Sequence, residues 1–185
     1  MAQHIIGIAG EMASGKDTVT AYLVERYGAR QFRFSDPLRT VLKVLHKEVT
    51  RDNLTAVSVH LRAAFGQDLL AHVVEQEAVH AEEDIVVIDG VRRLSDIDLV
   101  KDRPEFILVY TETDLQTRYD RLHKRGQNDD DSTLTFEQFV EDHQNETERG
   151  IQSLKQYAAL TIENNGTLEE LYAKVDAFVA TLKNA

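Results

Sequence analysis

A glycine-rich stretch near the N-terminus has the residue types and the spacing that bind a polyphosphate. Its sequence is Gly10-Glu11-Met12-Ala13-Ser14-Gly15-Lys16-Asp17-Thr18. Glycines let consecutive backbone N–H groups turn toward a polyphosphate, a helix N-terminus adds partial positive charge, and Lys16 adds a full one. An apolar run over 5–9 predicts a strand before the stretch, and the apolar spacing over 19–27 predicts a helix after it. This order favours a P-loop over a glycine turn that serves only packing.

Two acidic residues have positions suited to a metal ion beside that loop. Asp17 follows Lys16, where the P-loop pattern usually has a Ser or Thr bound to Mg²⁺. Asp89 ends the apolar run over 85–88, the clearest strand of the chain. A carboxylate at the end of a strand next to a P-loop is predicted to hold Mg²⁺ directly or through water. The alternative for Asp89 is a turn residue before Gly90.

Arginines gather in two later segments. Arg92 and Arg93 follow Asp89, and we expect Arg92 to point into the crevice and Arg93 away from it. Arg118, Arg121 and Arg125 are spaced three and four apart, so they are predicted to share one helix face. There they would clamp phosphates and neutralise charge during phosphoryl transfer, with Arg118 toward the acceptor. The alternative is a solvated face that pairs with nearby acidic residues.

Three further residues are candidates for binding an acceptor. Asp36 precedes Pro37, so it either caps a helix or contacts the acceptor and takes its proton. Arg39 and Arg62 lie in the helical block that follows, where each is either a ligand for an acceptor phosphate or a surface charge. These residues define the predicted second half of the site.

The elements that position these residues alternate between strand and helix. Strands are predicted over 5–9, 29–34, 85–88, 106–110 and 160–163, and their alternation with helices favours one α/β domain with a largely parallel sheet. No strand is predicted between 34 and 85, where helices from Asp36 and over 51–80, broken near Gly66, form the block. A short helix is predicted over 95–100, and a capping box at Thr135 begins another helix. In such sheets ligands bind beyond the carboxyl ends of the strands, so the candidate residues are expected in one crevice.

The predicted domain organisation is a single domain over 1–185. Its core covers 1–36 and 82–185, a helical acceptor-binding insertion covers about 37–81, and a lid covers about 118–135. The lid would exclude water that otherwise hydrolyses the donor.

The amino-acid composition argues against some classes of binding partner. The chain has 185 residues and a net charge of −11, which opposes a broad nucleic-acid footprint but not a local cluster of arginines for a small anion. There is no cysteine, no apolar run long enough to span a membrane and no signal-peptide pattern. We therefore expect a cytoplasmic protein without nucleic-acid or membrane partners, as a monomer or homodimer.

Together these motifs resemble the P-loop kinases of small metabolites, in the nucleoside monophosphate kinase group. Dephospho-CoA kinase-like proteins, phage-type deoxynucleoside monophosphate kinases and animal-type phosphomevalonate kinases are the families that it resembles most. The resemblance covers nearly the whole chain. It rests on Gly15-Lys16-Asp17, Phe34-Ser35-Asp36-Pro37-Leu38-Arg39, Asp89-Gly90-Val91-Arg92-Arg93, Arg121-Leu122-His123-Lys124-Arg125 and Tyr157-Ala158-Ala159-Leu160-Thr161-Ile162-Glu163-Asn164-Asn165-Gly166.

The resemblance implies a three-layer α/β/α fold with a five-stranded, largely parallel sheet. It implies ATP as donor, with the adenine against Asn165 and Gly166, and an acceptor phosphate near Arg39 and Arg92. It also implies that Asp17 is a family variant that reaches Mg²⁺, while Thr18 stays available to the phosphates. Strict dephospho-CoA kinases have a Ser or Thr after the lysine and an Asp-Ala-Asp-like acceptor motif, from which Asp17 and Ser35-Asp36-Pro37 depart.

The function favoured from the sequence is ATP- and Mg²⁺-dependent phosphorylation of a nucleoside or deoxynucleoside monophosphate. Dephospho-CoA kinase-like or phosphomevalonate kinase-like activity is an alternative. A nucleotide-binding NTPase module without a small-molecule acceptor is another.

Overall fold

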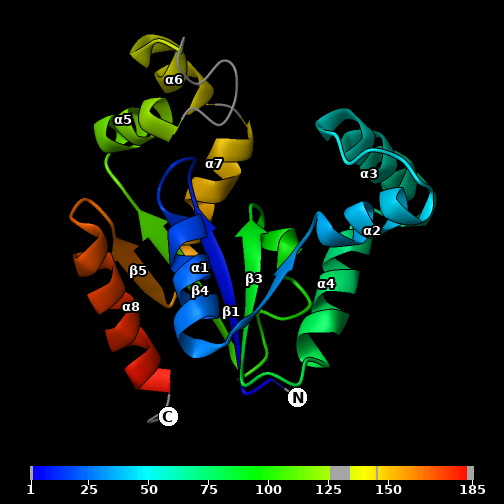
Figure 1. Ribbon diagram of the computed structural model, residues 1–185, viewed down its shortest axis with the longest axis horizontal. Helices are drawn as coiled ribbons and strands as arrows, with labels where there is room; N and C mark the ends of the chain where they lie inside the picture. Colours follow the sequence, from blue (N-terminus) through cyan, green and yellow to red (C-terminus); the bar gives the residue numbers. More distant parts are fainter. Residues whose placement is uncertain (1, 126–133, 145, 183–185) are drawn as a thin grey trace.

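Five parallel strands form the centre of the molecule (Figure 1). The computed structural model describes residues 2–125, 134–144 and 146–182. The strands are β1 (His4–Gly10), β2 (Arg30–Arg33), β3 (Ile85–Val91), β4 (Phe106–Glu112) and β5 (Leu160–Glu163). Their order in the sheet is β2-β3-β1-β4-β5, and every neighbouring pair is parallel. The carboxyl ends of all five strands therefore meet at one edge, and the glycine-rich loop follows β1 at that edge.

Strand β3 continues further than its sequence pattern predicts. The Asp89-Gly90 pair was expected to end the strand, yet pairing with β1 continues to Val91. Gly90 adopts a φ of 84°, and the register of β1 against β3 shifts between Ile8 and Ala9. Because glycine accepts this left-handed conformation without steric cost, the strand bends at Gly90 instead of ending.

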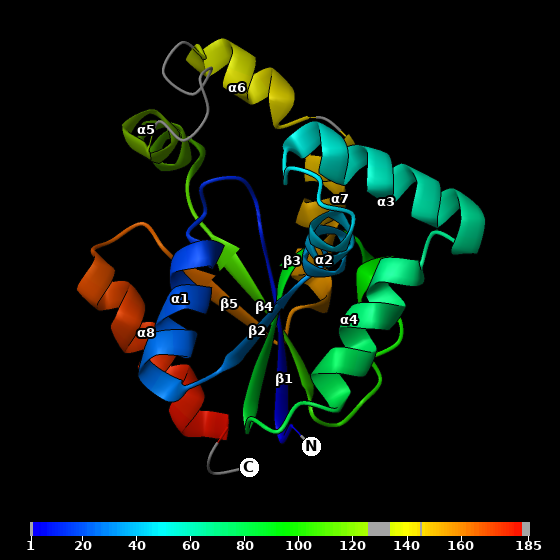
Figure 2. The same cartoon turned by 45° about the vertical axis from the view of Figure 1, so that its right-hand side comes forward.

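Helices cover both faces of the sheet (Figure 2). On one face α1 (Lys16–Tyr27) and α8 (Leu168–Leu182) bury an apolar cluster with β1 and β3 that includes Leu23 and Val175. On the other face α4 (Leu69–Val79) and α7 (Glu146–Ser153) contribute Val74 and Ile151 to a second cluster. Continuous apolar strands require this two-sided cover, and the predicted three-layer α/β/α architecture is confirmed.

The helical block between β2 and β3 has two different parts. Helix α2 (Asp36–Val44) and helix α3 (Arg51–Phe65) contact each other, and α3 buries none of its residues. Its apolar residues at helical spacing therefore form no buried face, and Phe65 is 69 % exposed. Helix α4 packs on β2 and β3 instead. The block predicted as an insertion over 37–81 thus contains one helix that covers the sheet and two that project beside its functional edge (Figure 1).

The remaining elements follow β3 and β4. A single 3₁₀ turn (Leu94–Asp96) replaces the short helix expected over 95–100. Helix α5 (Leu115–Arg125), helix α6 (Phe136–Asp142) and a 3₁₀ segment (Leu154–Tyr157) complete the chain. The capping box predicted at Thr135 is confirmed, since its hydroxyl accepts a hydrogen bond from the N–H of Gln138. Of the lid predicted over 118–135, residues 126–133 lie outside the described part of the chain.

Among the described helices, none combines the length and the apolar character that a membrane crossing needs.

Candidate active site

The glycine-rich loop has the backbone shape that a phosphate cradle requires. Gly15 opens α1 in a left-handed conformation with a φ of 96°, and no side chain caps this helix end. A Cβ at Gly15 would lie 2.1 Å from Nδ2 of Asn164, and one at Gly10 would lie 2.1 Å from Oγ1 of Thr111. Only glycine fits at these two positions. The loop therefore presents the N-terminus of a helix of more than three turns to a ligand, as a polyphosphate requires.

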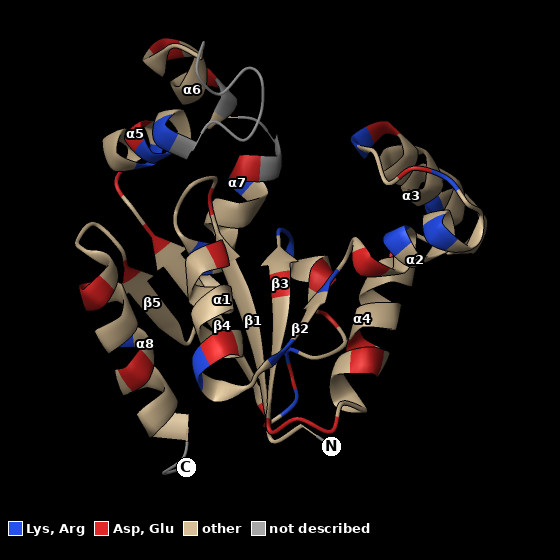
Figure 3. Ribbon diagram, viewed as in Figure 1, with Lys and Arg blue, Asp and Glu red and all other residues tan. Residues whose placement is uncertain are grey.

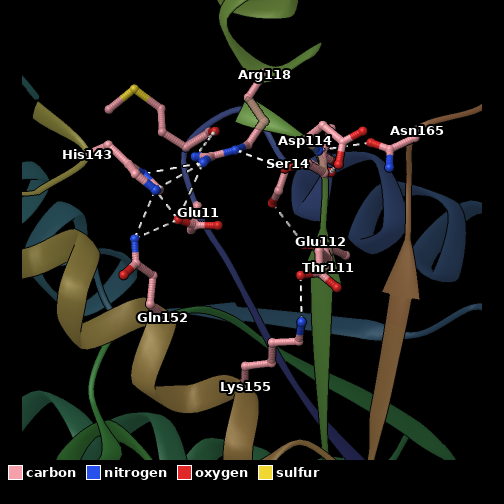
Figure 4. Close-up of polar contacts among 12 residues, drawn as sticks. Glu11, Ser14, Thr111, Glu112, Asp114, Arg118, His143, Gln152, Lys155 and Asn165 are labelled. Atoms are coloured by element: carbon pink, nitrogen blue, oxygen red, sulfur yellow. Dashed lines mark hydrogen bonds and ion pairs between the residues drawn. The ribbon is translucent and has the colours of Figure 1, made fainter. Parts of the chain in front are cut away.

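Buried side chains at the carboxyl ends of β4 and β5 hold this loop through hydrogen bonds to Ser14. The carbonyl of Ser14 accepts hydrogen bonds from Nδ2 of Asn164 and from Oγ1 of Thr113, each at 2.9 Å. The Ser14 hydroxyl shares a hydrogen bond of 2.9 Å with Thr111 (Figure 4). Sequence reasoning missed Thr111, Thr113 and Asn164 as site residues. Their position at the carboxyl ends of β4 and β5, next to the loop, was the available signal.

A cleft of about 890 Å³ opens beside the loop at the same edge of the sheet. The residues that line it are Lys16, Asp17, Arg33, Phe34, Ser35, Leu38, Ser58, Arg62, Leu70, Asp89, Gly90, Arg92, Arg93, Asp96 and Gly150. Lys16 and Asp17 contact each other across 3.4 Å, between Nζ and a carboxylate oxygen. Figure 3 shows basic residues at this edge, on α3 and after β3. The cleft thus joins the loop to the helices α2 and α3.

Asp89 has the environment expected of a metal ligand. It is only 8 % exposed, and its Oδ2 accepts hydrogen bonds from Gln31 at 2.7 Å and from Arg33 at 3.3 Å. Its buried Oδ1 has no hydrogen-bond partner among the described residues. An unpartnered carboxylate oxygen costs free energy unless a ligand satisfies it, and Mg²⁺ prefers such oxygens. Asp89, together with Asp17 in the lining of the same cleft, therefore fits a magnesium ion. Sequence reasoning missed Gln31 and Arg33 as the residues that hold Asp89.

The arginines predicted for the acceptor separate into two groups. Arg62 and Arg92 line the cleft as expected, but Arg93 lines it too, with a nitrogen 3.5 Å from Asp96. The expectation that Arg93 points away is wrong because Asp96 holds its guanidinium at the cleft wall. Arg39 is exposed and does not belong to the cleft lining, because α2 turns Leu38 and Leu42 inward instead.

Asp36 also lies outside the cleft lining. The N-cap of α2 is Ser35, so Asp36 is the first residue of the helix instead of its cap. Its Oδ2 accepts a hydrogen bond of 3.0 Å from the backbone N–H of Arg33. The carboxylate therefore closes the turn between β2 and α2, and this contact competes with the role predicted for it at an acceptor.

Two of the three arginines of α5 have described side chains, and both contact Thr113. Arg118 is buried, and its Nε donates to the carbonyl of Thr113 at 3.1 Å. Arg121 donates to Oγ1 of Thr113 at 3.4 Å, and its guanidinium lies 4.0 Å from the position of a Cβ at Gly15. Burial lowers the pKa of Arg121. Both arginines therefore reach the phosphate loop, Arg118 through the carbonyl of Met12 at 3.5 Å, and neither belongs to the cleft lining. The side chain of Arg125 lies outside the described part of the chain.

The alternative pairing of these arginines with Glu112 and Asp114 is not found in the described part of the chain. Glu112 pairs with Lys155 at 2.5 Å, and the N–H of Asp114 donates to Oδ1 of Asn165 at 2.9 Å (Figure 4). Asn165 thereby ties the loop after β5 to the start of α5. Gly166 follows it in the same loop, and the adenine contact of this pair stays a prediction.

Glu11 differs from the other residues of the loop. Its carboxylate is buried and contacts Arg118 at 3.4 Å, His143 at 3.1 Å and Gln152 at 3.0 Å (Figure 4). His143 follows α6, and Gln152 lies in α7. Sequence reasoning expected Glu11 among the ATP-binding residues and missed His143 and Gln152, whose spacing in the sequence gives no signal. Through Glu11 the loop touches three elements that precede β5.

Comparison with known proteins agrees with this geometry. The profile of the AAA domain family matches residues 6–149. A UPF0200 protein of Thermococcus kodakarensis is 31 % identical over 95 % of this chain and 96 % of its own length. A UPF0200 protein of Sulfurisphaera tokodaii is 31 % identical over 93 % of each chain.

Solved structures share the fold at low identity. The structure of TT1252 from Thermus thermophilus aligns with a TM-score of 0.60 and 20 % identity, over 98 % of this chain and 99 % of that one. Shikimate kinase from Acinetobacter baumannii, in complex with shikimate, aligns with a TM-score of 0.53 and 18 % identity, over 98 % of this chain and 94 % of that one. These likenesses support a kinase-like P-loop fold. The chain therefore belongs to the AAA domain family of P-loop NTPases and to the UPF0200 proteins.

Proposed function

We propose that this protein is an ATP- and Mg²⁺-dependent kinase of a small phosphorylated metabolite, with a nucleoside or deoxynucleoside monophosphate as the favoured acceptor. One observation carries the proposal. A single cleft contains the phosphate-loop residues Lys16 and Asp17, the metal-type carboxylate Asp89 and four arginines, Arg33, Arg62, Arg92 and Arg93. An NTPase that transfers only to water needs no second anion-binding wall of this kind.

The phosphate loop and the residues beside it form the donor half of the site. The loop amides and Lys16 bind the donor phosphates, and Arg121 contacts the same phosphates from α5. Asp89, with its unpartnered Oδ1, and Asp17 would hold the magnesium ion. When bound, the metal neutralises charge on the transferred phosphoryl group. These side chains keep the donor in the orientation that in-line transfer requires.

The acceptor half of the site consists of cleft residues outside the phosphate loop. Arg62 and Arg92 hold the acceptor phosphate, while Phe34, Leu38 and Leu70 supply apolar surface for the rest of the molecule. A phosphate oxygen is already ionised at neutral pH, so positioning and charge neutralisation supply most of the catalysis. A hydroxyl acceptor would need a general base instead. Asp36, the candidate base, is held by the backbone of Arg33, which favours the phosphate acceptor.

The test is a coupled assay of ADP release from ATP and Mg²⁺ across a panel of acceptors. The panel contains the ribo- and deoxyribonucleoside monophosphates, dephospho-CoA and phosphomevalonate. We expect a nucleoside monophosphate to raise ADP release at least about tenfold over ATP alone, since acceptor binding completes the site. Stimulation by dephospho-CoA or phosphomevalonate alone would replace the favoured acceptor. Hydrolysis that no acceptor stimulates would contradict the kinase proposal.

A further inference from the structure

A buried carboxylate in a phosphate loop requires an explanation, because it would repel the polyphosphate that the loop binds. Glu11 is 8 % exposed, and its side chain is satisfied by donors outside the loop. Arg118 supplies a full positive charge at 3.4 Å, and Gln152 donates a hydrogen bond at 3.0 Å. These partners hold the Glu11 charge within the cluster and neutralise part of it.

Arg118 also contacts the loop backbone at Met12 and the segment after β4 at Thr113. Its Nε donates to the carbonyl of Thr113 at 3.1 Å, and its Nη1 donates to the carbonyl of Met12 at 3.5 Å. Its Nη2 lies 3.3 Å from Nδ1 of His143. The guanidinium thus connects the loop backbone to His143, which follows α6. A displacement of His143 would therefore change a contact of the loop.

His143 and Gln152 close the cluster from the α6–α7 side. The Nε2 of Gln152 lies 3.0 Å from Nε2 of His143, and each side chain also contacts Glu11. Residues 134–144 and 146–153 thereby provide two of the three partners of the Glu11 carboxylate among the described residues. Ile151 packs α7 into the core, so Gln152 stays in place. If residues 134–144 moved away, Glu11 would lose His143 and would gain the freedom to approach the phosphates.

A metal ion is a weaker explanation of this cluster. One ligand atom each from Glu11, His143 and Glu148 lies within 4.8 Å of the other two, which is a spacing that a cation could use. The Arg118 guanidinium, however, lies 3.4 Å from Glu11 and 3.3 Å from His143. Its positive charge opposes a second cation at the same carboxylate.

We propose that Glu11 is a positioning residue that couples nucleotide binding at the loop to docking of residues 134–144, which include α6 and His143. When His143 holds Glu11, the loop accepts the phosphates; when His143 leaves, the carboxylate moves toward the phosphates and repels them. Because such coupling is reciprocal, nucleotide in the loop also stabilises the docked segment. The inference rests on the proposed function in one respect, namely that the loop binds a nucleotide.

The test is a double-mutant cycle on the affinity for Mg·ADP, measured by calorimetry. His143→Ala releases Glu11, so it should raise the Kd about tenfold, within the range of measured coupling effects. In a Glu11→Gln background no charge is released, so the same substitution should change the Kd less than about twofold. Glu141→Ala, at an exposed position two residues before His143, is the matched control and should leave the Kd unchanged.

Hydrogen exchange supplies a second readout that does not depend on the measured affinities. Saturating Mg·ADP should slow amide exchange in α6 of the wild-type protein, and Glu11→Gln should reduce that protection. Equal effects of His143→Ala in both backgrounds would show that His143 only supports the fold, and would overturn the coupling. Absence of Mg·ADP binding to the wild-type protein would instead contradict the proposed function, and the inference with it.

Discussion

At the scale of single residues, the site depends on contacts that distant parts of the chain make with the phosphate loop. Asp89 is a residue of the site whose burial costs free energy. Its Oδ1 is buried without a partner among the described residues, while Oδ2 is held by Gln31 and Arg33. A folded protein tolerates an unsatisfied carboxylate oxygen where a ligand later satisfies it.

Asp89→Asn tests this view of the metal site. The variant should lose at least about 100-fold in Mg²⁺-dependent turnover, or about 3 kcal/mol of transition-state stabilisation. Its thermal midpoint without nucleotide should be no lower than that of the wild type, because a buried neutral amide costs less than a buried charge. Asp84→Asn, an exposed acid just before the same strand, is the control. Retained turnover in Asp89→Asn would contradict the metal role.

Asn164 is a residue that holds the phosphate loop and that the sequence did not predict for the site. Its Nδ2 donates to the carbonyl of Ser14, and it fills the space that a side chain at Gly15 would need. Asn164→Ala should lower the free energy of unfolding by about 1–3 kcal/mol, as loss of a buried hydrogen bond does. It should also weaken Mg·ADP binding, measured by calorimetry, because the loop loses one of its anchors.

The neighbouring Asn165 provides the comparison for that variant. It is exposed, and its side chain accepts a hydrogen bond from the backbone of Asp114. Asn165→Ala should therefore destabilise the protein less than Asn164→Ala. The reverse order of unfolding free energies, measured in urea, would show that the contact with Ser14 does not hold the loop.

At the scale of helices and strands, the sequence predicts the framework well because local patterns determine it. Apolar runs mark the strands, and capping residues such as Thr135 mark where helices begin. Burial is harder to predict from the same patterns. Helix α3 has apolar residues at helical spacing but buries none of them, since it projects beside the sheet instead of covering it. Apolar periodicity identifies the apolar face of a helix, but not which element that face packs against.

Site residues were predictable where one short segment contains the chemistry. The phosphate loop and Asp89 both follow strands, and their residue types identify them. The anchors Thr113 and Asn164 were not predictable, because they meet Ser14 across sequence separations of 99 and 150 residues. The same holds for His143, which reaches Glu11 from beyond α6. Such partners are determined by the order of the strands in the sheet, which no local spacing reveals.

A hydrogen bond between α1 and α8 makes the stability of the fold depend on pH. The Tyr27 hydroxyl donates to Asp176 at 2.6 Å, and this bond, with burial, raises the pKa of Tyr27 to about 12. A raised folded-state pKa contributes stability that is fully present below the unfolded value of about 10 and is lost as pH rises through 12.

Urea unfolding at a series of pH values tests this contact. Between pH 10 and about 12 the unfolding midpoint of the wild type should fall more steeply than that of Tyr27→Phe, because the variant lacks the titrating hydroxyl. Tyr157→Phe, at an exposed position, should follow the wild type. Parallel slopes for Tyr27→Phe and the wild type would contradict the proposed bond.

At the scale of the whole molecule, an acidic protein contains a basic cleft. The net charge is −11, yet the cleft lining has five basic side chains against three acidic ones. Low-dielectric walls concentrate that local field, so the cleft attracts anions that the rest of the surface repels. This distribution suits a small phosphorylated substrate and opposes extended nucleic acid. Both halves of the proposed reaction therefore belong to one side of the sheet.

The most direct measurement is transfer of the γ-phosphoryl group itself. The wild-type protein is incubated with Mg²⁺, ATP labelled in the γ-phosphate and each nucleoside monophosphate, and the products are separated. The account predicts label in a nucleoside diphosphate. It also predicts that Arg62→Ala raises the KM for the acceptor at least about tenfold while changing the KM for ATP little, since loss of an ion-paired contact costs this much. Label that appears only in inorganic phosphate, with every acceptor, would contradict it.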